Sequence, residues 1–191
     1  MSKVSFIYTR DYKDVKAGIE KAINLLDNVP SFYDKRVLLK VNLMKGAPPD
    51  RALNTHPEFV RAMIRIVKEK GGKPLVGDSS GLVGLTNKAF EASGIAKVAK
   101  EEGAELKNFD AMTLHKKEIP GEIIQNIWIP EELLKIDVRI TLPKLKTHTL
   151  TVLTGAIKNQ MGLLPGGTKS KIHQLVPAVR KLSRALVDIN L

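Results

Sequence analysis

At residues 36–42 the chain reads RVLLKVN, a nearly continuous apolar run that is typical of a strand buried on both faces of a sheet. The next apolar run, residues 74–77, follows a segment at residues 57–70 whose apolar side chains have helical spacing. A strand, a helix and a second strand in this order predict a βα unit with parallel strands. We therefore expect an α/β fold with a mostly parallel sheet flanked by helices.

The same alternation continues on both sides of this unit. Further strands are expected at residues 3–8, 105–109, 127–129 and 136–142. Further helices are expected at residues 12–26, 86–92, 95–102, 149–162 and 176–187, with a loop at Gly166 and Gly167. Thr55 and Thr86 stand before two of the helices, where a threonine hydroxyl can cap free N–H groups.

The chain is expected to form one domain over residues 1–191, because this length buries a sizeable core and no internal repeat interrupts it. It stops at Leu191 after a helix with no following strand, which predicts a fragment of a longer domain. No apolar run approaches the roughly 20 residues of a membrane-spanning helix. The first residues lack the apolar stretch of a secretory signal, so we expect a cytoplasmic protein without a membrane partner.

The amino-acid composition limits the kinds of site and partner that the chain can have. The chain has no cysteine, which excludes a disulfide framework, a thiolate metal site and an iron–sulfur cluster held by this chain. Lys and Arg number 31 against 20 Asp and Glu, a net charge of +11 that attracts phosphate esters, carboxylates or acidic proteins. The Lys- and Glu-coated helices also fit a thermophile-like surface. Aromatic residues are only 5% and no DNA-binding motif occurs, so nucleic acid ranks below the other partners.

Polar residues gather where the expected parallel strands end, the edge at which such sheets bind ligands. They occur at the end of the strand at 36–42, in the loop GDSSG at 77–81, and in PKLKTHT at 143–149. The candidate ligand-binding residues are Lys40, Asn42, Asp78, Ser79, Ser80, Gly81, Lys144, Lys146, Thr147 and Asn159. In the alternative interpretation, Asp78 and the serines only satisfy a turn or cap a helix.

The segment from Pro143 to His173 adds groups that can transfer protons. Imidazoles titrate near neutrality, and a lysine beside other cations can become a base or a nucleophile. His148, Lys158 and His173 are therefore the candidate catalytic residues, and His173 is also a candidate metal ligand. Each of them alone is more often structural than catalytic.

Several stretches together resemble the family called domain of unknown function 362. They are VLLKVN, THPEFVRAMIRIVKEKGG, VGDSSG and DVRITLPKLKTHTLTVLTGAIKNQMGLLPG with a trailing His, and they extend from about Val37 to His173. The resemblance implies the fold rather than a function, because the family's name assigns no activity. Relatives frequently carry a ferredoxin-like iron–sulfur module, and this chain has no cysteine for one.

A more distant similarity links His148, Lys158 and His173, with LLPG after the lysine, to the lactate racemase family. It implies that Lys158 attaches a nickel-pincer nucleotide, that His173 binds its nickel and that His148 is an acid or base. The chain departs from that family where a further catalytic His is expected, since only Asp78 and Ser79 occur there.

These features leave several functions open, and whether the protein is an enzyme is open with them. The first is binding of an anionic small molecule or cofactor at the strand ends, linked to proton or electron transfer. The alternatives are a non-catalytic basic module that docks an acidic or iron–sulfur protein, a relative of the nickel-pincer racemases, and nucleic-acid binding.

Overall fold

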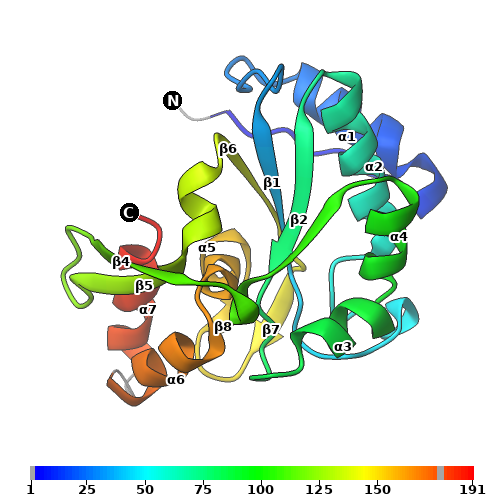
Figure 1. Cartoon of the computed structure of the whole chain (residues 1–191). Helices are drawn as coiled ribbons and strands as arrows, with labels where there is room; N and C mark the ends of the chain where they lie inside the picture. Colours follow the sequence, from blue (N-terminus) through cyan, green and yellow to red (C-terminus); the bar gives the residue numbers. More distant parts are fainter. Residues whose placement is uncertain (1–2, 176–178) are drawn as a thin grey trace.

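The structure, a computed structural model, describes residues 3–175 and 179–191. Its centre is a parallel sheet of strand order β3-β2-β1-β6, which confirms the α/β fold (Figure 1). The strands are β1 (Arg36–Val41), β2 (Lys73–Asp78), β3 (Glu105–Asn108) and β6 (Val138–Leu142). β1 lies between β2 and β6, with Leu39 opposite Val76 on one side and Ile140 on the other. The expected buried strand is thus the middle of the sheet.

Alternation along β1 divides its side chains between the two faces of the sheet. Val37, Leu39 and Val41 belong to the larger apolar core, whereas Leu38 packs with Phe109 and Leu163 in a separate cluster. Lys40 has the same parity as Leu38 and therefore points to that second face. A lysine in this strand is consequently buried inside the molecule.

One face of the sheet is covered by the first half of the chain (Figure 1). Its elements are the turn η1 (Tyr12–Asp14), α1 (Val15–Asn24), the turn η2 (Pro49–Arg51), α2 (Pro57–Glu69), α3 (Thr86–Ala92) and α4 (Ile95–Glu101). Val60, Ile64 and Val67 of α2 are fully buried against the strands. The expected helices in this half are therefore confirmed.

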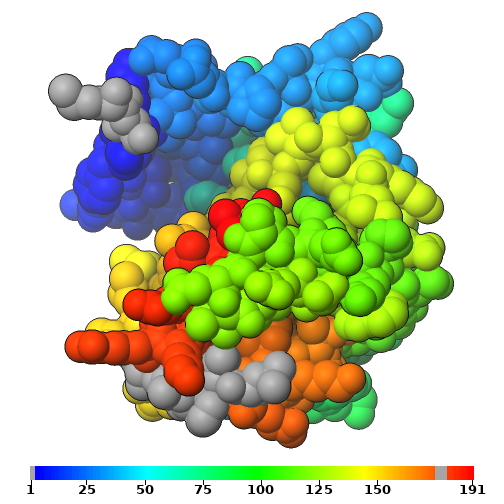
Figure 2. Space-filling view, turned by 90° about the vertical axis from the view of Figure 1, so that its left-hand side faces the viewer, coloured from blue at the N-terminus to red at the C-terminus, as the bar shows by residue number. Residues whose placement is uncertain are grey.

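The other face carries elements from the second half of the chain. They are the turn η3 (Phe109–Ala111), the hairpin β4 (Leu114–Glu118) and β5 (Asn126–Pro130), the turn η4 (Glu131–Lys135), α5 (Ala156–Asn159), the turn η5 (Gln160–Leu163), α6 (Gly166–Leu175) and α7 (Val179–Asp188). Ile127 of the hairpin and Leu186 of α7 share a second apolar core. Figure 2 shows this green hairpin lying against the red C-terminal segment.

The helix expected at residues 149–162 is wrong in its first part, where the structure has a separate two-stranded sheet. The antiparallel pair β7 (Lys146–His148) and β8 (Val152–Thr154) occupies the first part, and helical structure begins only at Ala156. Threonine and valine are frequent here, and β-branched side chains favour a strand over a helix. The loop expected at Gly166 and Gly167 is also wrong, because α6 begins there and the Gly166 N–H donates to Asp110 Oδ1 at 2.7 Å.

Residues 3–8 do not form the expected strand. Val4, Phe6 and Tyr8 are 87%, 88% and 79% exposed, and no described strand pairs with this segment. An alternating pattern becomes a strand only where another strand supplies hydrogen bonds. The last expected helix, residues 176–187, is described from Val179 onward, and residues 176–178 lie outside the described part.

Both expected threonine caps are wrong as well. His56, not Thr55, caps α2, with its Nδ1 accepting from the Glu58 N–H at 3.2 Å. The Thr55 hydroxyl instead accepts from the Asn42 N–H and donates to the Leu142 carbonyl, tying β1 to β6. Thr86 lies inside α3, where its hydroxyl accepts from the Ser80 N–H and donates to Asp110.

Among the described residues, no helix combines the length and the apolar character that crossing a membrane requires.

Candidate functional site

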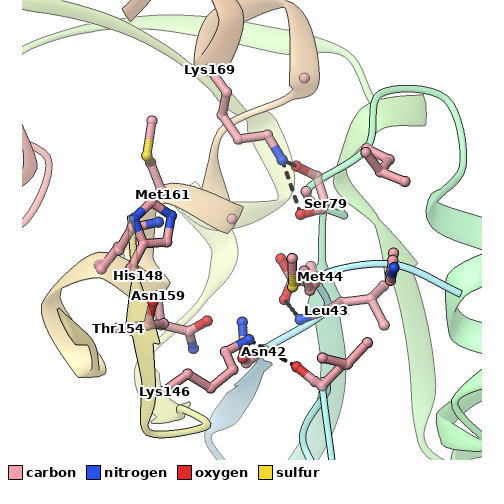
Figure 3. Close-up of a pocket in the computed structure, with 18 of the residues that line it drawn as sticks. Asn42, Leu43, Met44, Ser79, Lys146, His148, Thr154, Asn159, Met161 and Lys169 are labelled. Carbon is pink, nitrogen blue, oxygen red and sulfur yellow. Dashed lines mark hydrogen bonds between the residues drawn. The ribbon is translucent and has the colours of Figure 1, made fainter. Parts of the chain in front are cut away.

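A cavity of about 620 Å³ opens where β1 and β2 end. Its walls come from the loops after these strands, from the β7–β8 hairpin, and from α5 and α6. In Figure 3, Lys146 and His148 approach from the hairpin side, while Asn42, Leu43 and Ser79 approach from the strand ends. The cavity therefore lies at the edge of a parallel sheet where ligands usually bind.

Most of the residues expected from the sequence meet at this cavity. Those that line it are Asn42, Asp78, Ser79, Gly81, Lys146, Thr147, His148, Lys158, Asn159 and His173. Lys40 and Ser80 are fully buried and Lys144 lies elsewhere, so these three do not line it. The structure thus gathers the three candidate catalytic residues in one place, and their chemical roles remain predictions.

A buried polar network forms the floor of the cavity. Lys40 Nζ lies 2.9 Å from Asp78 Oδ2, and it also donates to the Val41 carbonyl at 2.6 Å. Asp78 accepts a further hydrogen bond from the Leu43 N–H at 3.0 Å. The Asn159 amide donates to Thr141 Oγ1 at 2.9 Å and to the Lys40 carbonyl. These contacts fix strand β1, strand β2 and helix α5 relative to one another.

Burial sets the electrostatics of this floor. It raises the pKa of Asp78 to about 6, although the charge of Lys40 acts in the opposite direction. Burial also lowers the pKa of Lys40, against the attraction of Asp78. Both directions have the same cause, because each charge loses its hydration when it enters the interior.

Lys169 is a cavity residue that was not among the predicted ligand-binding residues. Its ammonium group donates to the Ser79 carbonyl, to Ser79 Oγ and to the Ser80 carbonyl at 2.5–3.0 Å. Ser79 Oγ in turn donates to the Leu164 carbonyl at 2.6 Å. These contacts bind α6 to the GDSSG loop. The alternative that the two serines serve the structure of this loop therefore accounts for their contacts. The sequence placed Lys169 in the same cationic segment, but nothing in its spacing marked it as facing this loop.

Besides the exposed Lys45, Lys158 and Lys146 bring positive charge into the cavity. Burial lowers the pKa of Lys158, and in the described part of the chain this amine has no hydrogen-bond or carboxylate partner. Burial together with the charge of Lys158 also lowers the pKa of Lys146, whose ammonium group donates to the Leu53 carbonyl at 2.8 Å. Lys158 is consequently a half-buried cation of the cavity that is free to meet a ligand.

The two histidines face the same cations. Burial, and then the charge of Lys158, lower the pKa of both His148 and His173. His148 Nδ1 accepts from the N–H groups of Leu150 and Thr151 in the turn that follows β7. Val152 in this hairpin has a φ of 62°, a conformation that is costly for a β-branched residue.

Negative charge is scarce around the site. From residue 138 to residue 187 the sequence contains no Asp or Glu, although Lys and Arg recur throughout this segment. Asp78 is the carboxylate that lines the cavity, and Lys40 already neutralises it. Within the described ranges, no group of at least three His, Cys, Asp or Glu could hold a metal ion. His173 therefore lacks protein co-ligands there, and its role as a metal ligand remains a prediction.

Comparison with known proteins gives a family and a longer relative. The model of the family described as Domain of unknown function (DUF362) matches residues 37–191. A thylakoid-associated protein of Synechocystis sp. is 30% identical over 184 residues, which cover 91% of this chain and 54% of that protein. The chain thus spans about half the length of the curated relative that it matches. No solved structure matches the chain.

Proposed function

This chain belongs to the Domain of unknown function (DUF362) family, and we propose that it binds an anionic small molecule or cofactor in the cavity at its strand ends. One observation carries the proposal. Lys158 lies half-buried in that cavity without a carboxylate partner among the described residues, beside Lys146, His148 and His173. A desolvated cation of this kind gains free energy when an anion replaces its lost hydration.

The chemistry that this arrangement favours is proton transfer to or from the bound anion. An amine whose pKa is lowered by burial loses its proton nearer to neutral pH and can then act as a base. His173, whose pKa is also lowered, lies in the same cavity and can exchange protons near neutrality. We assign the proton-transferring roles to Lys158 and His173.

Sulfate is a suitable probe for the test, because its charge is constant near neutral pH. Lys158→Ala is expected to weaken sulfate binding by about tenfold, measured by calorimetry at low ionic strength. Lys144→Ala is the matched control, since it removes the same charge from the same segment but outside the cavity. Equal losses in the two variants, or none in either, would show that the cavity is not the binding site. Circular dichroism of both variants verifies that the fold is retained.

The nickel-pincer nucleotide is a second candidate ligand, supported by the meeting of His148, Lys158 and His173 in one cavity. The residues fit the cofactor in part. Lys158 offers a free amine for attachment and Lys146 a charge for its phosphate, whereas His173 would be the protein ligand of the nickel. When bound, such a group would supply hydride chemistry. Metal analysis and intact mass of protein purified from its own source test this: nickel with added mass on Lys158 supports it, and an unmodified, metal-free chain contradicts it.

Docking of an acidic or iron–sulfur protein is a third candidate, favoured by the net charge of +11. Its affinity should fall steeply with salt and survive His148→Ala. Nucleic-acid binding makes the same salt prediction, and a shift assay with duplex and single strands separates the two.

We place the protein in the cytoplasm, whereas the name of the Synechocystis relative associates that protein with thylakoids. Fractionation of the source cells, with a high-salt wash of the membranes, distinguishes a free protein from one held at a membrane surface by its charge.

A further inference from the structure

His148 has a hydrogen-bonding pattern that fixes which ring nitrogen carries its proton. Nδ1 accepts two backbone hydrogen bonds, from Leu150 N–H at 3.1 Å and from Thr151 N–H at 3.2 Å. A nitrogen that accepts two N–H groups has its lone pair engaged and carries no hydrogen. In the neutral ring the hydrogen must then be on Nε2.

The surroundings of His148 also oppose a second proton. Protonation of Nδ1 would turn both backbone N–H groups from partners into repelling donors. The charged and titratable groups that act on the ring are Lys146 from its own strand, Lys158 from α5 and His173 from α6. Since all of these are cationic or neutral, none favours the doubly protonated ring.

We propose that His148 is a neutral imidazole at neutral pH whose Nε2–H donates a hydrogen bond to an oxygen of the bound ligand. The proposal rests on the anion-binding function for its ligand, and it adds the class of atom that is recognised: a carboxylate, phosphate or carbonyl oxygen. It differs from the acid–base role that the sequence predicts for His148. A neutral imidazole with Nε2 already protonated polarises or orients an oxygen but does not accept its proton there.

Strain in the hairpin supports a dedicated position for this ring. Val152, which has a φ of 62°, lies directly opposite His148 in the β7–β8 pair. Such a conformation costs about 1–3 kcal/mol and persists where the surrounding structure holds it. The tight turn that it closes is the one that aims the Leu150 and Thr151 N–H groups at the imidazole.

The first experiment determines the tautomer. Protein labelled with ¹⁵N-histidine is studied by two-bond ¹H–¹⁵N spectra from about pH 5.5 to about pH 8.5, a range that brackets the ordinary imidazole pKa. His148 signals are assigned by their loss in His148→Gln. We expect the Nε2–H tautomer at neutral pH, with any titration midpoint below the ordinary imidazole pKa. An Nδ1–H tautomer, or a midpoint at or above the ordinary imidazole pKa, overturns the proposal.

The second experiment measures the hydrogen bond through sulfate affinity. Glutamine keeps a terminal N–H donor and cannot titrate, so His148→Gln should bind sulfate within about threefold of the unaltered protein. His148→Leu fills similar space without a donor and should bind about tenfold more weakly. Equal affinities of the two variants contradict the donor role. If the unaltered protein binds no sulfate, the anion-binding function fails for this probe, and the NMR experiment alone decides the state of His148.

Discussion

Lys40 and Asp78 form a salt bridge of 2.9 Å between strands β1 and β2, with side-chain exposures of 0% and 2%. The pair lies directly beneath the cavity, since Asp78 lines it and Lys40 contacts the cavity residue Asn159. Moving two charges into the interior costs hydration energy that their mutual attraction often does not recover. We therefore infer that the pair serves mainly to hold the strand ends in position. Removal of one partner should therefore be far more damaging than removal of both.

Asp78→Asn is expected to lower the free energy of unfolding by about 3–5 kcal/mol, because it leaves the Lys40 charge buried without its partner. Lys40→Met should be similarly damaging. The double variant Lys40→Met, Asp78→Asn should lose less than either single variant, as a double-mutant cycle in urea would show. Lys3 and Asp27 form an exposed pair, so Asp27→Asn is the control and should change stability by less than about 1 kcal/mol. Additive losses at Lys40 and Asp78 would mean that the two charges do not depend on each other.

Gly162→Ala tests how closely the backbone packs on this pair. A Cβ at this position would lie 2.6 Å from Lys40 Nζ and would collide with the Asp78 carboxylate. Neither atom can retreat in a buried network, so we expect a loss of about 1–3 kcal/mol in unfolding free energy, together with weaker sulfate binding. Gly167 provides the matched control, because nothing lies within 4 Å of a Cβ there and it is inside α6. Gly167→Ala should stabilise the protein slightly when both variants are unfolded in urea. A harmless Gly162→Ala would contradict the close packing.

The parallel sheet and the meeting of the strand ends could be predicted because they follow from local signals. The apolar run at β1 and the helical spacing of α2 each need only their own residues to be recognised. Parallel strands then bring their carboxyl ends to one edge, which places Asn42, Asp78 and Lys146 together without any further information. The convergence of His148, Lys158 and His173 does not follow from this rule, because these residues lie on β7, α5 and α6 and not at the ends of the parallel strands.

What could not be predicted depends on contacts between distant residues. The apolar spacing of residues 149–154 fits a helix as well as a hairpin, and only the pairing of β7 with β8 decides between them. Thr55 has the spacing of a cap, yet its hydroxyl is used by Asn42 and Leu142. Lys40 was expected to face a ligand, whereas the strand's alternation directs it into the interior, where Asp78 accepts its charge.

Glu102 should govern part of the acid stability. Hydrogen bonds and charge from Arg65, and then from Arg61, lower its pKa from 4.5 to about 2. A carboxyl group with a lowered folded-state pKa stabilises the protein above its unfolded pKa, and this contribution is lost as the pH falls. The unfolding free energy should therefore drop between about pH 4.5 and pH 2, by about 1–2 kcal/mol after allowance for solvent screening of the two arginines. Urea unfolding of Glu102→Gln should show a smaller drop over this interval, and an unchanged drop would assign it to other carboxylates.

Sulfate affinity should fall as the pH rises. The fall should begin at a lower pH than the titration of an ordinary lysine would produce. Sulfate keeps its charge over this range, so any change reports on the protein. Burial lowers the pKa of Lys158 and of Lys146 below the ordinary lysine value, and each loses its attraction for the anion as it loses its proton. The affinity should thus begin to decline below the pH range in which an ordinary lysine titrates.

Arginine substitutions at these positions distinguish the contributions of the two lysines to the pH dependence. Because a guanidinium group stays protonated, Lys158→Arg should flatten part of the decline, and the double variant with Lys146→Arg should flatten more of it. Lys144→Arg, outside the cavity, should leave the profile as it is. A profile that is flat in the unaltered protein would mean that both amines stay charged in the cavity. A decline that is unchanged in the double variant would place the titrating group elsewhere, and calorimetric titration at each pH distinguishes these outcomes.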